Sequence, residues 1–195
     1  MLRASTILHF PKIRKFAVDY LSTVYPDELS SVKTASQVQI EYAAEAISHG
    51  RKYNVSSILK RAFFELACNP APTLDSSEND SEATLPDKAD LVKVLHVQQQ
   101  LIIRWHETTT LSEIECSNCW PDGQPDDPDP SRNPHFGRLN LLTTCPLDPI
   151  RGIQELISAD WEEHGYCTRC VKARVTGLEE HRKKIWEDLG EWIAI

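Results

Sequence analysis

The chain has 195 residues, of which 41% are hydrophobic and 26% charged, so it can bury the core of one ordinary domain or two small ones. Its 21 Lys and Arg against 29 Asp and Glu give a net charge of −8, which disfavours nucleic-acid binding driven by phosphate neutralisation. No apolar run approaches the roughly 20 residues that span a bilayer, which excludes an integral membrane protein, and no glycine-rich phosphate-binding motif occurs.

The N-terminal segment combines basic residues with an amphipathic pattern. Residues 1–18 contain no acidic residue, as in a mitochondrial presequence. The pattern continues past Asp19, however, which favours a surface helix over residues 8–24 with Pro11 in its first turn. The core-facing positions of this helix are Ile13, Phe16, Ala17, Tyr20, Leu21 and Val24. Because no secretory signal is indicated, we expect an intracellular protein, cytoplasmic or nuclear, whose cysteines are thiols or metal ligands.

Two more helices are predicted before the first proline cluster. Residues 35–53 place Val38, Tyr42, Ala43, Ala46 and Ile47 on one face. A third helix has Ser56 as its N-cap and ends at Asn69, since Pro70 follows. Its apolar face consists of Ile58, Leu59, Ala62, Phe63 and Leu66.

An acidic segment then divides the chain. Residues 71–90 hold six acidic residues and few large aliphatic ones, which predicts a flexible loop, with an acidic partner-binding segment as the alternative. We therefore expect a helical region at 1–69, an acidic loop at 70–88 and a second helical region at 89–195.

The second region is also predicted to be helical. Apolar residues recur at helical intervals from Asp90 to Trp105, from Pro149 to Trp161 and from Thr168 to Trp192, with Arg182 in the one polar slot of the last stripe. A proline-rich irregular stretch covers residues 120–138. No strand is indicated, so the predicted fold class is all-α and bundle-like.

Four of the six cysteines form two CxxC pairs, and these are the candidate metal ligands. The pairs are Cys116 with Cys119 and Cys167 with Cys170. Two such pairs complete a tetrahedral four-sulfur site, which suits Zn²⁺ in a structural role with no open position for water. We therefore expect a zinc clip that joins the pairs across the intervening loop and contributes to folding.

Other interpretations of the cysteines remain open. One pair could be a thioredoxin-like dithiol, although the βαβ context of that motif is missing, or the cysteines could be small buried hydrophobic residues. Cys145 and His164 are possible substitute ligands, and Cys68 is expected in the core.

No catalytic constellation is recognisable in the sequence. The HExxH and GxSxG motifs are missing, and no two histidines are four residues apart. We therefore expect no enzymatic activity.

Several segments resemble one known family in combination. Residues 10–17 (FPKIRKFA) and 51–67 (RKYNVSSILKRAFFELA) look like the helical region that follows the BTB core in fungal BTB/POZ-domain proteins. Further likeness lies at residues 116–119, 147–149, 166–170 and 182–189. In that family the BTB core mediates dimerisation and sometimes binding to cullin-type ubiquitin ligases. The resemblance implies that such a core would precede Leu2, so we expect a truncated member or a gene model that lacks a first exon.

The missing catalytic motifs, the CxxC pairs and the resemblance together predict a non-enzymatic scaffold for protein contacts, stabilised by zinc, with unidentified protein partners. The alternative is a zinc-containing nuclear regulator that contacts DNA through a basic cluster on the last helix. This cluster consists of Arg169, Lys172, Arg174, Arg182, Lys183 and Lys184. Acidic residues interleave it, which is typical of a solvated helix face. A dithiol oxidoreductase is the third possibility.

Overall fold

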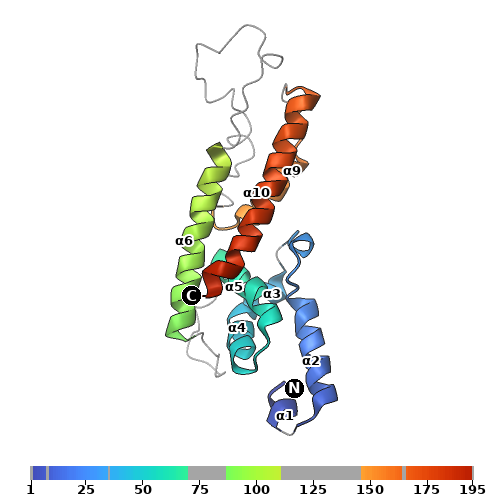
Figure 1. Cartoon of the computed structure of the whole chain (residues 1–195), viewed down its shortest axis with the longest axis vertical. Helices are drawn as coiled ribbons and strands as arrows, with labels where there is room; N and C mark the ends of the chain where they lie inside the picture. The colour runs from blue at the N-terminus through green and yellow to red at the C-terminus, as the bar shows by residue number, and fades with distance from the viewer. Residues whose placement is uncertain are drawn as a thin grey trace. The chain divides into compact units, whose positions relative to one another are not determined.

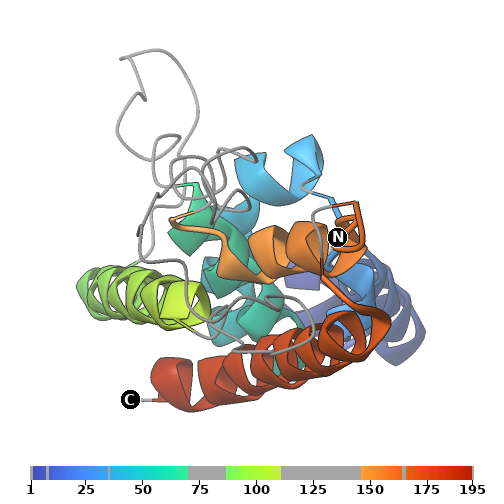
Figure 2. The ribbon, with the colours of Figure 1, turned by 90° about the horizontal axis from the view of Figure 1, so that it is seen from above.

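The computed structural model describes residues 2–7, 9–34, 36–69, 87–110, 146–163 and 166–194 (Figure 1). Within these ranges the regular structure is helical and contains no strand, which confirms the all-α fold class. The chain forms two compact units, Met1–Gln99 with Asp188–Ile195 and Gln100–Glu187. Two long helices, α6 (Lys88–Thr110) and α10 (Thr168–Ala194), contribute to both units, and each is continuous (Figure 2).

The predicted domain division places an acidic loop at 70–88, and an irregular stretch is predicted at 120–138. Residues 70–86 and 111–145 lie outside the described ranges, so both interpretations stay predictions. In the part of the chain that is described, no helix is both long enough and apolar enough to cross a bilayer.

The N-terminal segment forms two helices where one was predicted. α1 covers Leu2–Ile7 and α2 covers Pro11–Val24, so the expected helix start at Leu8 is wrong. His9 has a φ of 55°, outside the right-handed helical region. The residue before a proline is biased away from helix, which explains the break at Phe10. Pro11 lies in the first turn of α2, as predicted.

The helix predicted at 35–53 is also interrupted, at Tyr42. α3 covers Gln37–Glu41 and α4 covers Ala43–Lys52. α4 ends in a Schellman motif, in which the amide of Val55 donates to the carbonyl of Gly50 at 2.8 Å and that of Asn54 donates to the carbonyl of Arg51 at 3.3 Å. Asn54 has the left-handed φ of 53° that this motif requires and that asparagine tolerates.

The third predicted helix begins differently from the expectation. Ser56 opens a 3₁₀ turn, η2 (Ser56–Ile58), and no side chain caps α5 (Leu59–Cys68), so the N-cap assigned to Ser56 is wrong. The end at Asn69 is confirmed. All five predicted inward residues of this segment are buried, and Cys68 is half-buried.

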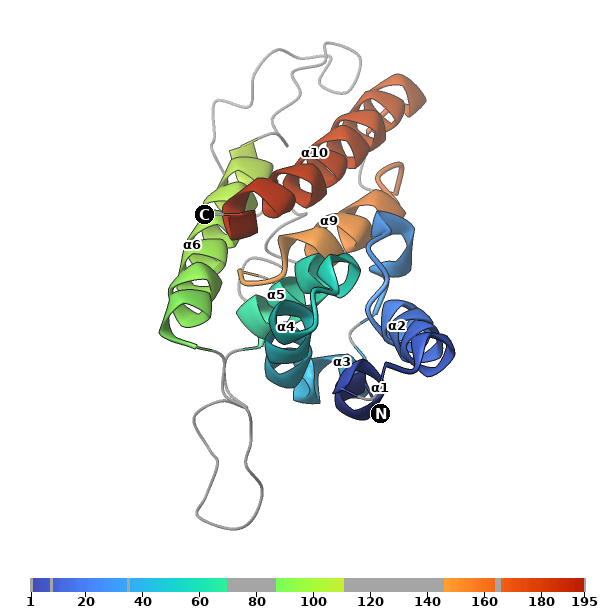
Figure 3. The same ribbon diagram turned by 60° about the horizontal axis from the view of Figure 1, so that its bottom comes forward.

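Close packing of α4 on α5 requires a glycine (Figure 3). A Cβ atom on Gly50 would lie 2.5 Å from Cδ2 of Leu59 and 3.3 Å from the carbonyl oxygen of Val55. The missing side chain therefore creates the space in which Leu59 sits.

α6 begins at Lys88, earlier than predicted, and its first turns are tied to the rest of the first unit. Lys88, the last residue of the predicted acidic loop, therefore belongs to the helix, and Asp90 is buried with Oδ1 3.3 Å from Nε of Arg51. Gln98 donates to the carbonyl of Ala67 at 3.0 Å, and Lys93 donates to that of Ile193 at 3.1 Å.

In the second unit, α10 contacts both α9 (Pro149–Ser158) and the C-terminal half of α6. Asp148 caps α9, as its Oδ1 accepts from the amide of Arg151 at 3.1 Å. Nε of Arg182 donates to the carbonyl of Ile150 at 3.0 Å, and Nε2 of His181 donates to that of Arg104 at 3.3 Å. Arg182 therefore occupies the polar slot in the stripe, as predicted.

Candidate functional site

An exposed aromatic face is the feature of the first unit that sequence patterning assigned to the core. Phe16 and Tyr20 on α2 are 63% and 62% exposed, and Val38 and Tyr42 are 54% and 48% exposed. Their predicted inward placement is therefore wrong, as is that of Ile13, whereas Ala17 is buried. The break at Tyr42 explains why Val38 and Tyr42 are exposed, because it interrupts the helical period assumed for residues 35–53.

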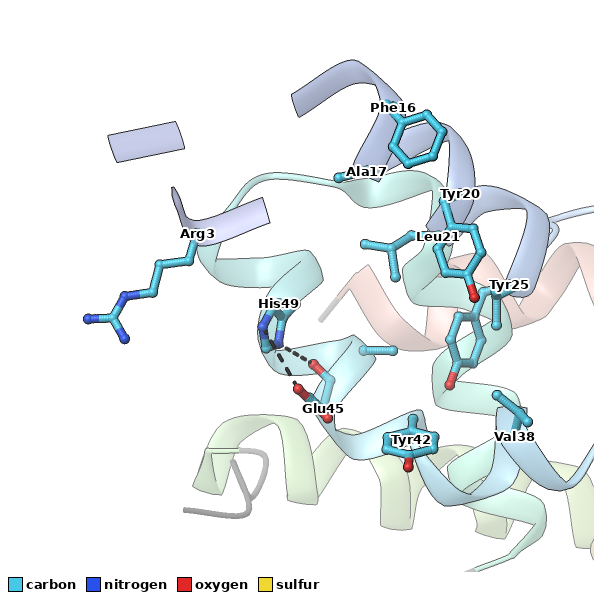
Figure 4. Close-up of a pocket in the computed structure, with 12 residues that line it drawn as sticks. Arg3, Phe16, Ala17, Tyr20, Leu21, Tyr25, Val38, Tyr42, Glu45 and His49 are labelled. Atoms are coloured by element: carbon cyan, nitrogen blue, oxygen red, sulfur yellow. Dashed lines mark hydrogen bonds and ion pairs between the residues drawn. The ribbon is translucent and has the colours of Figure 1, made fainter. Parts of the chain in front are cut away.

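These side chains line a groove between α2 on one side and α3–α4 on the other (Figure 4). We call it the α2–α4 groove and define it by the residues Phe16, Tyr20, Leu21, Val38, Tyr42 and His49. Its volume is about 600 Å³, within the range of about 300–1,000 Å³ typical of ligand sites.

Polar groups lie at one end of the groove. His49 donates from Nδ1 to the carbonyl of Glu45 at 2.9 Å, and its Nε2 lies 4.0 Å from Oε1 of the same residue (Figure 4). Arg3 of α1 also lines the groove. The groove thus combines an apolar surface with a few charged groups, which is typical of a surface that binds another molecule.

A buried polar network holds the walls of the groove in position. Arg61 on α5 donates from Nη1 to Oγ of Ser31 at 3.2 Å and from Nη2 to Oε1 of Gln39 at 3.0 Å. Its Nε lies 2.7 Å from Oε1 of Glu65. Gln39 lies on α3, and its backbone carbonyl accepts from the hydroxyl of Tyr25 at 3.1 Å. One guanidinium on α5 therefore connects to α3 directly, and to the end of α2 through Gln39.

The hydroxyl of Tyr25 acts as a donor throughout the physiological pH range. Burial raises the pKa of Tyr25 well above its usual value, and the nearby carboxylates of Glu65 and Glu45 raise it further. The phenol consequently stays protonated and keeps its hydrogen bond to Gln39.

Sequence reasoning missed this network. Arg61 and Glu65 are four residues apart, the spacing at which opposite charges meet on a helix. That spacing is the available signal, but it is typical of solvated helix faces, because charged side chains are seldom fully buried.

The second CxxC pair opens α10. Cys167 precedes the helix and accepts from the amide of Val171 at 3.0 Å through its backbone carbonyl, while Cys170 lies buried in the first turn. The pair thus occupies a helix N-terminus, where the macrodipole favours thiolates.

The other predicted ligands, Cys116 and Cys119, lie outside the described residues, as do the possible substitutes Cys145 and His164. In the ranges that the structure covers, no group of three or more His, Cys, Asp or Glu side chains could hold a metal ion. The four-cysteine zinc site therefore stays a prediction.

The basic cluster of the last helix is only partly available at the surface. The guanidinium of Arg174 lies over the ring of Trp161 at 4.3 Å and over that of Tyr166 at 4.5 Å, and both Arg174 and Arg182 are buried. Their assignment to a DNA-contacting surface is wrong, since neither is open to a phosphate. Lys183, which is exposed, lies 3.7 Å from Glu187.

Comparison with models of protein families, with curated proteins and with solved structures found no match in any of the three. The groove and its chemistry are therefore the features from which a function can be inferred.

Proposed function

We propose that the chain is an intracellular, non-enzymatic protein–protein interaction module that binds its partner through the α2–α4 groove. The observation that carries the proposal is the exposed apolar face made by Phe16, Tyr20, Val38 and Tyr42. Large exposed apolar patches mark interaction sites, and aromatic residues are enriched in interfaces. The resemblance to the region after the BTB core agrees with such a role.

The proposal is tested by comparing the proteins bound to the full chain and to a groove variant. Phe16→Glu places a charge on the apolar face, at a side chain that is already exposed, so the fold should be kept. Val92→Glu is the matched control, because Val92 is an equally exposed apolar residue on α6.

Pulldowns from cells of the native source, quantified by mass spectrometry, should yield proteins that the wild type and Val92→Glu retain and Phe16→Glu loses. Far-UV circular dichroism checks that both variants remain helical. The same proteins bound equally by all three forms would contradict the assignment of binding to this groove.

We also propose a structural zinc ion held by Cys116, Cys119, Cys167 and Cys170. The supporting observations are the two CxxC pairs and the position of the second pair at the start of α10. Elemental analysis of protein purified without added metal should find about one zinc per chain, as a single closed four-cysteine site requires. Cys167→Ser should lose that zinc and melt at a lower temperature, whereas Cys68→Ser should retain it. A wild-type chain without zinc would contradict this part.

A further inference from the structure

We infer that the partner seated in the α2–α4 groove is a second copy of this chain, related to the first by a two-fold axis. The inference rests on the proposed function, since it names the partner of the same groove. Three properties of the groove support it: its shape, the signs of charge on its two walls and its area.

The first property is the shape of the groove, because the same residues line it and also protrude from the surface. Phe16 and Tyr20 line the groove, and each still exposes more than half of its surface. A two-fold interface uses the same patch on both copies, so each patch must be complementary to itself. Exposed rings beside a hollow meet this requirement, because the rings of one copy can enter the hollow of the other.

The second property is the opposite charge of the exposed residues that flank the apolar side chains of the two walls. On α2, the exposed Lys12 and Lys15 lie next to Phe16, at four residues and one residue before it. On the opposite wall, the exposed Glu41 and Glu45 lie beside Tyr42.

A two-fold axis that sets α2 of one copy on α3–α4 of the other brings lysines opposite glutamates, and does so twice. A partner helix of a single sign would match only one wall. Asp19 on α2 carries the opposite sign to the two lysines, so the complementarity belongs to the two pairs and not to every residue. Of the four residues only Glu45 lines the groove, where Arg3 of α1 also lies, and the other three flank it. The basic residues Arg51 and Lys52 at the end of α4 lie outside the lining as well, and Arg51 pairs with Asp90.

The third property is the apolar area. The exposed parts of Ile13, Phe16, Tyr20, Val38 and Tyr42 add up to roughly 500 Å², at about 150–250 Å² for each large side chain. A standard interface buries about 800 Å² per partner, and homodimer interfaces are about 65% apolar. The apolar area of this face is therefore what a stable homodimer of standard size requires.

Sedimentation velocity of the full chain, from about 1 to 100 µM so that weak dimers are also detected, tests the inference. The wild type should sediment near twice its mass of 22.2 kDa. Phe16→Glu should be monomeric across the whole range, and Val92→Glu should remain dimeric. Circular dichroism shows whether each variant is folded.

A charge exchange tests the two-fold arrangement itself. The variant Lys12→Glu/Lys15→Glu should dimerise at least tenfold more weakly than the wild type, and so should Glu41→Lys/Glu45→Lys. An equimolar mixture of the two variants should recover dimers, because each lysine pair then meets a glutamate pair at both contacts. If both variants dimerise weakly and their mixture does not recover dimers, the two-fold arrangement is overturned.

The outcomes separate this inference from the proposed function. A wild type that stays at 22.2 kDa throughout, or a dimer that Phe16→Glu leaves intact, overturns the second copy as occupant. Other proteins that depend on Phe16 in the pulldown would then leave the proposed function standing with a different partner. If neither dimers nor such proteins are found, both the inference and the proposed function fail.

Discussion

Arg61 and Glu65 form an ion pair inside α5, with Nε of the arginine 2.7 Å from Oε1 of the glutamate and at most 1% of either side chain exposed. The two terminal nitrogens of the guanidinium donate to Ser31 and Gln39. Taking two charges out of water is expensive, and hydrogen bonds to the remaining groups offset part of that cost. The pair therefore makes the surrounding fold depend on both partners being present.

Removing one member of this pair should be much worse than removing both. We expect Arg61→Met to lower the free energy of unfolding by about 3–5 kcal/mol, because it leaves the carboxylate of Glu65 buried without its counter-charge. The double variant Arg61→Met/Glu65→Leu should recover a large part of that loss. Urea unfolding followed by circular dichroism measures both. A double variant less stable than the single one would contradict this account.

Two glycine substitutions should have opposite effects. Gly50→Ala places a Cβ 2.5 Å from Leu59 Cδ2, and such overpacking costs about 1–3 kcal/mol, more than the gain in helix propensity of up to about 1 kcal/mol. Gly177→Ala on α10 meets no atom within 4 Å, so it should stabilise the chain through propensity alone. Thermal unfolding of both variants should give a lower midpoint for the first and a higher one for the second. A rise for Gly50→Ala would mean that Leu59 moves aside at no cost.

The cap of α9 should be separable from its ion pair. Oδ1 of Asp148 caps the amide of Arg151, and Oδ2 lies 2.7 Å from Nη1 of the same residue. Asp148→Ala removes both interactions and should cost about 2 kcal/mol. Asp148→Asn keeps the capping oxygen and should cost clearly less. Equal losses in urea unfolding would show that the charge, not the cap, matters.

His181 should make the chain less stable in mild acid. Burial lowers the pKa of His181, although its hydrogen bond to Arg104 and the nearby Glu107 act in the opposite direction. The unfolded chain, with an ordinary pKa of about 6.5, therefore takes up this proton first as the pH falls. The stabilisation that results from the lowered pKa of His181 is complete above the unfolded-state pKa and is lost as the pH falls below it. The free energy of unfolding should thus drop less between pH 7.5 and 5.0 for His181→Gln than for the wild type. Parallel losses would show that other groups carry the pH dependence.

The existence and type of most helices could be predicted, because the local signals were strong. Pro11 and the Asp148–Pro149 pair mark helix starts, and the Asn69–Pro70 pair marks an end. The break at Tyr42 and the 3₁₀ turn at Ser56 carry no comparable signal, since each depends on how the segment packs on its neighbours.

The groove could not be located from the sequence, because periodicity identifies an apolar stripe but not what covers it. Ala17 and Phe16 belong to the same stripe of α2, yet the first is buried and the second is exposed. Buried charges pose the converse difficulty. Nothing in the sequence indicates that Asp90 is buried, because its partner Arg51 is 39 residues away.

The anchoring of Gln39 by Arg61 has a consequence for the kinetics of association. Since α3 is held before any partner arrives, little rearrangement is needed on encounter, and the association rate would be set by diffusion and by the attraction between lysine-bearing and glutamate-bearing surfaces. Added salt would then slow the encounter, whereas a loosened Arg61 would slow it at every salt concentration.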